Sequence, residues 1–241
     1  VWKDKKNSPP LIAFGLIGSA LCQYGYYTSI QYSNAAFATV LSYTAPVMIL
    51  VYTVVKERRA PRGYELAAVL LVALGAFSCA TQFKLGALHI APLALIWGLL
   101  SAVAFAFYTI TPQKLIQEYS LLPIVGWGMI LGGIVLALLC RPWTVAVTVN
   151  AHLFIMLAGV IFLGTICSFC FYQAGVSIVG GLAGSILSAA EPVTSVMIST
   201  LLLHVLFTSF DLAGFVMILT AIPLIAVGEH WSEKQVVSLR K

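Results

Sequence analysis

The chain has 241 residues, of which 61% are apolar and only 9% are charged, whereas about a quarter of the residues in a soluble globular domain carry a charge. This composition excludes an ordinary soluble domain and indicates a protein whose solvent is the lipid bilayer. The formal net charge of +5 does not indicate nucleic-acid binding, because the basic residues stand in short clusters between apolar runs, where they orient a membrane protein.

Eight apolar runs, taken in chain order, are long enough to cross the roughly 30 Å hydrocarbon core of a bilayer as helices. A helix satisfies its own backbone hydrogen bonds inside the membrane, and the runs lack the alternating pattern of barrel strands. We therefore expect an all-α polytopic membrane protein with eight transmembrane helices. The predicted spans cover residues 10–31, 35–55, 64–82, 91–113, 121–140, 152–177, 182–204 and 210–228.

Lysine and arginine are unequally divided between the two sides of these spans. Eleven lie on one side and two on the other, and an excess of basic residues marks the cytoplasmic side of a membrane protein. We therefore expect a multi-pass protein of the cytoplasmic membrane with both visible termini in the cytoplasm. The eleven are Lys3, Lys5, Lys6, Lys56, Arg58, Arg59, Arg62, Lys114, Lys234, Arg240 and Lys241, and the two are Lys84 and Arg141.

The sequence is similar to itself when it is shifted by 146 positions. The shift aligns residues 11–74 with residues 157–220 without a gap. Because it spans five predicted helices, the second copy would enter the membrane from the opposite face, as in the inverted repeats of many secondary transporters. Identical pairs include Gly18/Gly164, Tyr26/Tyr172, Leu41/Leu187, Ser42/Ser188, Pro46/Pro192, Val47/Val193, Leu66/Leu212 and Ala67/Ala213.

This repeat predicts how the chain is organised. Residues 1–85 would hold the last three helices of the first copy, residues 86–230 the five helices of the second copy, and residues 231–241 a cytoplasmic tail. The two helices that open the second copy would have counterparts before Val1. We therefore expect a ten-helix parent whose first two helices are missing from this sequence.

Several motifs point to one known group of membrane proteins. The stretch from Tyr27 to Ala76 combines an aromatic residue before a small-residue turn, a Ser-x-x-x-Pro helix and the string Lys56-Glu57-Arg58. The second copy carries Leu187-Ser188-Ala189-Ala190-Glu191-Pro192-Val193. In these motifs the chain resembles the drug/metabolite transporter superfamily, specifically bacterial permeases built from two EamA-type five-helix repeats.

The resemblance covers nearly the whole chain and includes the stretches Trp97 to Thr111 and Gly126-Trp127-Gly128-Met129. It implies a ten-helix permease with both termini in the cytoplasm. One departure concerns the Gly-Glu pair that usually follows the penultimate helix of each repeat in this family. The first copy keeps Glu57, whereas the second copy reads Leu203-His204-Val205.

Glu191 is the charged residue that lies deepest inside a predicted span. An ionised carboxylate at mid-bilayer costs several kcal/mol, so the side chain should face the protein interior or water, or carry a proton. A role in substrate binding or proton coupling is our leading interpretation. The alternative is a protonated glutamate that donates a hydrogen bond to a neighbouring helix.

Pro46 and Pro192 occupy equivalent positions in the two copies. Each removes a helical donor and disturbs the preceding turn, so each is a candidate bend for alternating access, although ordinary transmembrane prolines also kink helices. Aromatic and amide side chains could orient a polar solute or instead anchor helices at the interface. These further candidates for the substrate or proton pathway are Gln23, Tyr27, Tyr43, Tyr108, Tyr172 and Gln173.

The pattern as a whole favours a secondary transporter of a small metabolite or drug-like solute, with proton coupling as one option. The alternatives are a non-transporting membrane fragment or assembly partner and an intramembrane enzyme, which would normally need several convergent polar residues. The expected partners are a small-molecule substrate and the lipid bilayer, with protons and a second copy of the chain as further candidates. No nucleotide-binding motif or metal-ligand spacing is present, and we expect neither enzymatic catalysis nor a metal or cofactor.

Overall fold

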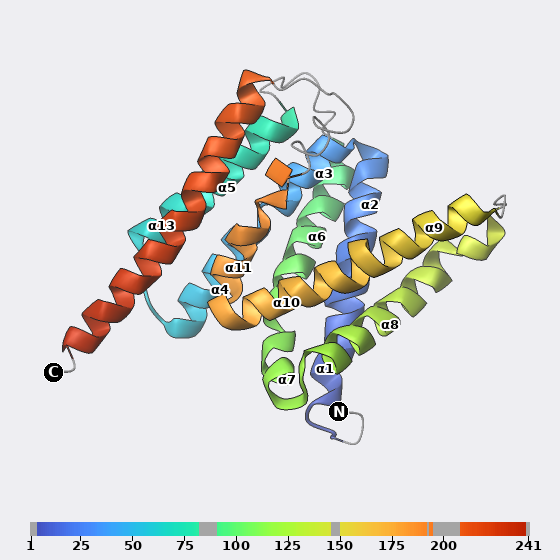
Figure 1. The fold of residues 1–241 in the computed structure, drawn as a ribbon, viewed down its shortest axis with the longest axis horizontal. Coiled ribbons are helices and arrows are strands. Elements are labelled where there is room, and N and C mark those ends of the chain that lie inside the picture. Colours follow the sequence, from blue (N-terminus) through green and yellow to red (C-terminus); the bar gives the residue numbers. More distant parts are fainter. Residues whose placement is uncertain (1–3, 82–90, 146–149, 192, 195–207, 240–241) are drawn as a thin grey trace.

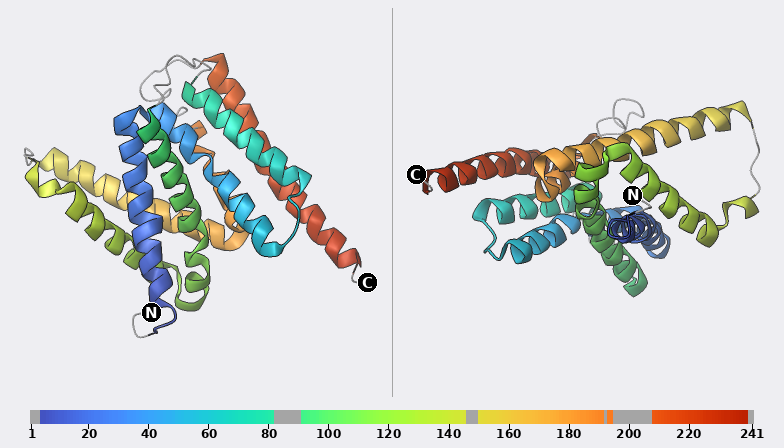
Figure 2. Two further views of the ribbon diagram at one scale, coloured as in Figure 1. Left: turned by 180° about the vertical axis from the view of Figure 1, so that it is seen from behind. Right: turned by 90° about the horizontal axis from the view of Figure 1, so that it is seen from below.

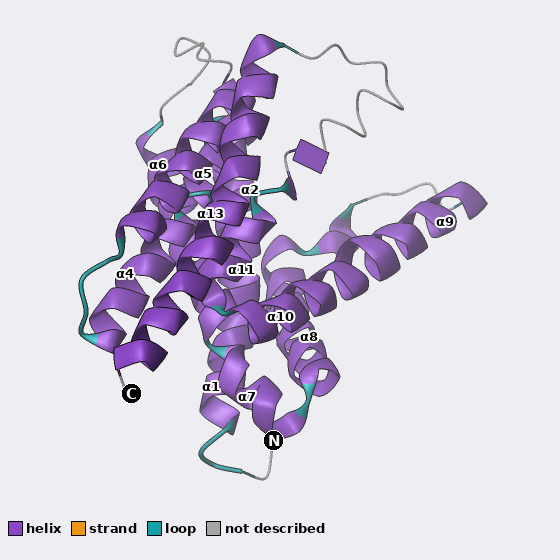
Figure 3. Cartoon of the chain, turned by 60° about the vertical axis from the view of Figure 1, so that its left-hand side comes forward, coloured by secondary structure: helices purple, strands orange, loops and turns teal. Residues whose placement is uncertain are grey.

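A computed structural model describes residues 4–81, 91–145, 150–191, 193–194 and 208–239. Within these ranges the chain forms helices joined by turns and short loops, with no strand (Figure 3). The all-α fold predicted from the sequence is therefore confirmed.

The first half of the chain forms one long helical rod followed by shorter helices. In the rod, α1 (Ser8–Ala13), the π-helical segment η1 (Phe14–Leu21) and α2 (Cys22–Tyr32) follow without a break. The helices that follow the rod are α3 (Ala35–Ser42), α4 (Ala45–Glu57), α5 (Gly63–Thr81), α6 (Pro92–Ile110) and α7 (Pro112–Tyr119).

The second half also contains a long helical rod. A second continuous rod consists of α9 (Ala151–Gly159), the π-helical segment η4 (Val160–Cys167) and α10 (Ser168–Val179). The other elements are α8 (Leu121–Cys140), the 3-10 turn η3 (Pro142–Thr144), α11 (Gly181–Ser188) and α13 (Ser209–Leu239).

Four helical stretches in the described ranges are long and apolar enough to cross a membrane. They are Phe37–Glu57, Pro92–Tyr119, Leu121–Cys140 and Ala151–Val179. Two shorter apolar stretches, Gly63–Ser78 and Leu212–Gly228, overlap the predicted spans 64–82 and 210–228. The predicted span 10–31 is helical throughout, whereas much of the predicted span 182–204 lies outside the described residues.

Local sequence signals explain where the helices begin and end. Asn34 and Asn150 cap α3 and α9, since their side-chain oxygens accept hydrogen bonds from the backbone N–H groups of Phe37 and Leu153 at 2.8 and 2.7 Å. Proline stands in the first turn of several helices, including α4, α6 and α7, where its missing N–H would have no helical partner. Arg58 and Arg141 end α4 and α8 in the left-handed conformation.

The helices pack into a main body with two projecting arms. In the body, α5 lies along α13 and α2 lies along α6 (Figure 1). An apolar core joins α4, α5, α11 and α13 through fully buried side chains such as Ile49, Val72, Ile186 and Ile218. The arms are the C-terminal end of α8 and the α9 end of the second rod, which extend away from the body in both views of Figure 2.

Equivalent elements recur at the spacing of 146 positions that the sequence suggests. The π-helical segments Phe14–Leu21 and Val160–Cys167 are related by that shift at both ends, and so are Ala35–Ser42 and Gly181–Ser188. Their packing differs. Segment η1 contacts α6 and α8 and contains buried residues, whereas η4 contains none in the described structure.

Candidate functional site

A cluster of polar side chains lies between α6, α7 and α10. The hydroxyls of Thr109 and Tyr172 are 2.8 Å apart. The Gln113 amide nitrogen donates to the side-chain oxygen of Gln173 at 2.7 Å and to the backbone carbonyl of Thr109 at 3.0 Å. The Gln173 amide nitrogen donates in turn to the carbonyl of Tyr108 at 2.9 Å. These bonds connect segments that are about 60 residues apart in the sequence.

The orientation of both glutamine amides follows from this network. Backbone carbonyls only accept hydrogen bonds, so the groups facing Tyr108 and Thr109 must be the amide nitrogens of Gln173 and Gln113. The side-chain oxygen of Gln113 is then left buried without a partner among the described residues. A buried acceptor without a hydrogen-bond donor lowers the stability of the fold by about 1–3 kcal/mol. A donor that bonded to the Gln113 oxygen would remove this cost.

Aromatic rings surround the polar cluster and hold it in place. Tyr108 is 3% exposed, and its ring stacks on Phe14 at a centroid distance of 5.1 Å and on Tyr172 at 6.2 Å. Phe169 meets the same ring edge to face at 5.7 Å. The Tyr108 hydroxyl has no hydrogen-bond partner among the described residues.

A pocket of about 990 Å³ opens beside this cluster. Its lining comes from α4, α6, α7, the junction of α10 with α11, and the loop between α4 and α5 with the start of α5. We call the part of the pocket lined by this loop its mouth. One part of the lining is apolar and consists of Met48, Ile49, Val103, Ala106, Phe107, Ile110, Val176, Val179 and Leu182. The other part is polar or charged, or has no side chain, and consists of Tyr52, Thr53, Lys56, Glu57, Arg59, Arg62, Glu65, Thr111, Gln113, Lys114, Gln117, Ser177, Gly180 and Gly181.

An ion-pair network fixes the loop at the mouth of the pocket. Arg59 bonds to the carboxylates of both Glu57 and Glu65, and the backbone N–H of Arg62 donates to Glu65 at 2.8 Å. The hydrogen bonds with Glu65 raise the pKa of the Arg59 guanidinium above its ordinary value, although burial opposes this effect. Arg59 therefore remains charged and joins the end of α4 to the start of α5.

The structure brings three of the candidate pathway residues together in the polar cluster, namely Tyr108, Tyr172 and Gln173. The others are not part of it. Gln23 is half-buried on α2, and Tyr27 is 60% exposed. Tyr43 packs against the apolar core.

Glu191 lies at an exposed position just beyond α11 and does not line the pocket formed by the described residues. Its backbone carbonyl accepts a hydrogen bond from the Thr194 hydroxyl at 2.9 Å. Pro192, the second candidate bend, lies outside the described residues, as do residues 195–207.

Thr109, Gln113 and the pair Arg59–Glu65 were not predicted from the sequence as site residues. A usable signal was present for the first two, because Thr109 and Gln113 are one helical turn apart and Pro112 stands between them. No comparable signal identifies the ion pair, since the partner of a charged residue depends on how the loop folds.

Helices break at two places that are 146 positions apart in the sequence. Helix α3 ends at Ser42, and Tyr43 follows with ψ near 4° before α4 begins at Ala45. Helix α11 ends at Ser188, and Ala189 follows with ψ near −7°. Pro46 is buried in the first turn of α4, so the break precedes the proline.

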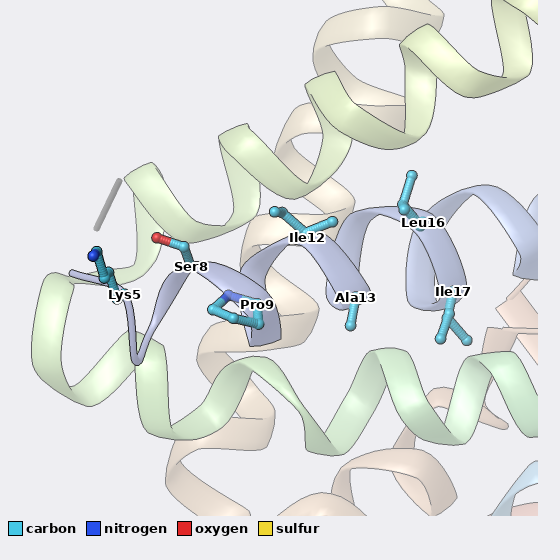
Figure 4. Close-up of a pocket in the computed structure, with 7 residues that line it drawn as sticks. All are labelled: Lys5, Ser8, Pro9, Ile12, Ala13, Leu16 and Ile17. Atoms are coloured by element: carbon cyan, nitrogen blue, oxygen red, sulfur yellow. The ribbon is translucent and has the colours of Figure 1, made fainter. Parts of the chain in front are cut away.

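A second, smaller hollow of about 490 Å³ lies on the outer side of α1 and η1. It is lined by Lys5, Ser8, Pro9, Ile12, Ala13, Leu16 and Ile17 (Figure 4). None of the candidate pathway residues lines this groove, and its lining is mostly apolar.

Comparisons with known proteins agree with this architecture. The EamA-like transporter family matches residues 1–81 and 92–227. The uncharacterized inner membrane transporter YicL of Salmonella typhimurium (strain LT2) is 35% identical over 227 residues, which is 94% of this chain and 76% of the relative. A solved crystal structure matches 90% of this chain and 76% of its own, with a TM-score of 0.74 at 16% identity. At that identity the likeness concerns the fold alone.

Proposed function

The chain belongs to the EamA-like transporter family, and from this premise we propose that it is a secondary transporter that moves a small solute across the cytoplasmic membrane by alternating access. The solute is a metabolite or drug-like molecule. The observation that carries the proposal is the pocket of about 990 Å³, which is large enough for a small solute. Its walls combine α4 of the first proposed repeat with α6, α7, α10 and α11 of the second.

The proposed mechanism rests on an inverted repeat of five plus five helices. Two elements recur with both ends shifted by 146 positions, and the starts of α5 and α13, Gly63 and Ser209, differ by the same number. These correspondences support a duplication. Two similar halves that enter the membrane from opposite faces can exchange conformations, and the exchange opens a central site to each side in turn.

The orientation follows from charge. The loop between α4 and α5 and the start of α7 carry basic residues on the side where eleven of the thirteen lysines and arginines lie. With that side in the cytoplasm, both visible termini are cytoplasmic, and the pocket mouth opens toward the cytoplasm.

Named residues have distinct roles in this proposal. Gln113 and the network around Tyr108 and Gln173 form the polar wall of the solute site. The helix breaks before Pro46 and at Ala189 are the bends around which the halves move. Glu191 carries a proton that couples solute movement to the proton gradient.

A reconstitution experiment tests the proposal. Liposomes that contain the purified protein are preloaded with a mixture of amino acids, amines and organic acids, and exchange of each labelled solute is measured. We expect saturable exchange of at least one solute, which Gln113→Leu reduces and Gln31→Leu leaves unchanged, because Gln31 is an exposed residue of α2 outside the pocket. A correctly folded protein that exchanges none of these solutes faster than empty liposomes contradicts the proposal.

A further inference from the structure

The charges around the pocket are unequally paired, and this determines which solutes it suits. The two acidic residues of the lining, Glu57 and Glu65, both bond to Arg59. The three other cations of the lining form no ion pair with any described residue. They are Lys56, Arg62 and Lys114.

The neighbours of these cations do not neutralise their charges, so the charges can interact with a bound anion. The Lys56 ammonium stands 5.4 Å from the centre of the Tyr52 ring, an interaction that keeps its full charge. Arg62 donates a hydrogen bond to the Tyr64 hydroxyl at 2.8 Å, which is a neutral partner. Lys114, on α7, is exposed and lines the pocket. Because an apolar wall adjoins them, the field of these cations is concentrated at the pocket.

The start of α11 adds a second source of positive potential. Gly180 and Gly181 line the pocket. Gly180 is the N-cap of α11 and has no side chain, so no capping side chain accepts hydrogen bonds from the free backbone N–H groups of the first turn. Such a helix terminus favours an anion. A Cβ at Gly181 would lie in ordinary van der Waals contact with Ile49, Thr109 and Ile110, at 3.7 Å, so the helix start is packed against α4 and α6.

The rest of the pocket lining indicates which uncharged part of a ligand would fit. Val103, Phe107 and Ile110 offer an apolar surface on α6. The unpartnered side-chain oxygen of Gln113 requires a hydrogen-bond donor. A suitable ligand therefore combines an apolar body that bears one N–H or O–H donor with an anionic group.

We propose that this pocket binds an amphipathic organic anion, whose apolar body lies against α6, whose donor reaches Gln113 and whose anionic group lies among Lys56, Arg62 and Lys114. The pocket is thereby the solute site of the transporter, and this part of the inference rests on the proposed function. The positive-inside rule explains why basic residues occur at this end of the molecule. It does not explain why both acids of the lining are bound to Arg59 while Lys56 and Lys114 form no ion pair with a described residue beside an apolar wall.

Equilibrium binding to the purified protein in nanodiscs of zwitterionic lipid tests this assignment without requiring transport. Three probes separate the contributions. Indole-3-acetate carries the anion and an indole N–H donor, tryptamine carries the same donor with a cation, and 1-naphthaleneacetate carries the anion without the donor. We expect indole-3-acetate to bind at least about tenfold more tightly than tryptamine, a difference of ~1.4 kcal/mol.

Substitutions at the pocket provide the matched comparisons. Lys114→Gln should weaken indole-3-acetate binding by about tenfold, whereas Lys5→Gln, which removes an equal charge outside the pocket, should leave binding unchanged. Gln113→Leu should weaken indole-3-acetate more than 1-naphthaleneacetate. Equal binding of indole-3-acetate and tryptamine by the unmodified protein overturns the proposal, and so does competition by simple acetate at the same concentration as indole-3-acetate.

The outcomes distinguish this inference from the proposed function. Selective binding of the indole anion by a protein that moves no solute across liposomes would support the anion site and contradict transport. Exchange of amines by a protein that does not bind the anions would support transport and contradict the anion site.

Discussion

At the scale of single residues, the polar cluster shows how a membrane helix bundle positions amides. Gln173 is fully buried, and its amide bonds to Gln113 on α7 and to the backbone of Tyr108 on α6. A buried polar group is stable in an apolar bundle only when its partners are in place. The network therefore fixes α10 against α6 and α7 and leaves the side-chain oxygen of Gln113 buried without a partner among the described residues.

Removing the central amide should destabilise this junction. Gln173→Leu leaves the carbonyl of Tyr108 without this donor and takes one partner from Gln113, so we expect the free energy of unfolding to fall by about 1–3 kcal/mol. Unfolding in mixed micelles measures the change. Gln31→Leu is the control, because Gln31 is exposed on α2, and equal stability of the two variants would show that the network contributes nothing.

Glu191 is the residue that we propose couples solute movement to the proton gradient. An ionised carboxyl group in the predicted interior of a span costs free energy unless it is hydrated, so the protonated form is favoured there. A group of this kind can exchange a proton during transport. Glu191→Gln preserves shape and one acceptor but cannot release a proton. We expect this variant to lose uphill uptake driven by a proton gradient and to retain exchange at equal solute concentrations. Gradient-driven uptake equal to that of the unmodified protein would remove Glu191 from coupling.

At the scale of elements, close helix contacts depend on particular glycines. A Cβ added at Gly132 would lie 2.7 Å from the Ser19 hydroxyl oxygen and 3.0 Å from the carbonyl oxygen of Gly15, whereas one added at Gly133 would meet no atom within 4 Å. The spacing Gly128-x-x-x-Gly132 indicates such packing from sequence alone, and the structure agrees. The small residues let α8 approach η1.

This contrast gives a paired test on adjacent residues. Gly132→Leu should reduce the amount of folded protein, since overpacking typically costs about 1–3 kcal/mol. Gly133→Leu should leave the amount of folded protein nearly unchanged. Size-exclusion chromatography of the detergent-solubilised variants provides the measurement. Equal yields of the two variants would mean that η1 and α8 are not in close contact.

How far the sequence predicts the elements depends on the kind of signal. Apolar runs and flanking prolines predict the helical ranges well, because a membrane leaves the backbone few alternatives. The π-helical segments Phe14–Leu21 and Val160–Cys167 and the break at Tyr43 were not predictable, since they depend on tertiary packing and small changes in backbone geometry. Tyr108, Tyr172 and Gln173 were identifiable as polar residues within spans. Their partner Gln113 was missed because it lies at the end of its predicted span.

The break before Pro46 yields a prediction about movement. Pro46 stands in the first turn of α4, where a proline fits the helix start and also prevents α3 and α4 from joining into one straight helix. Pro46→Ala should allow them to join and slow transport by roughly tenfold, or ~1.4 kcal/mol in activation free energy, with little change in folded protein. Transport rate per folded molecule in liposomes measures the effect, and an unchanged rate would contradict a hinge at this position.

At the scale of the whole molecule, orientation and pocket access are linked. Figure 1 places the start of α1, the end of α13, the short helix α7 and the loop between α4 and α5 toward the same side of the molecule. The pocket mouth is lined by that loop, so a protein with cytoplasmic termini presents the pocket to the cytoplasm. The charge bias therefore determines which compartment supplies the solute in this conformation.

Topology reporters test that link directly. A reporter fused after Lys241 should read as cytoplasmic, and one inserted between Leu85 and His89 should read as extracytoplasmic, because eleven basic residues lie on the first side and two on the second. A reporter pair in the opposite arrangement would place the mouth of the pocket outside the cell. In that case indole-3-acetate added outside intact cells would reach Lys56, Arg62 and Lys114 without crossing the membrane, and the conformation seen here would be the outward-open state of the same alternating cycle.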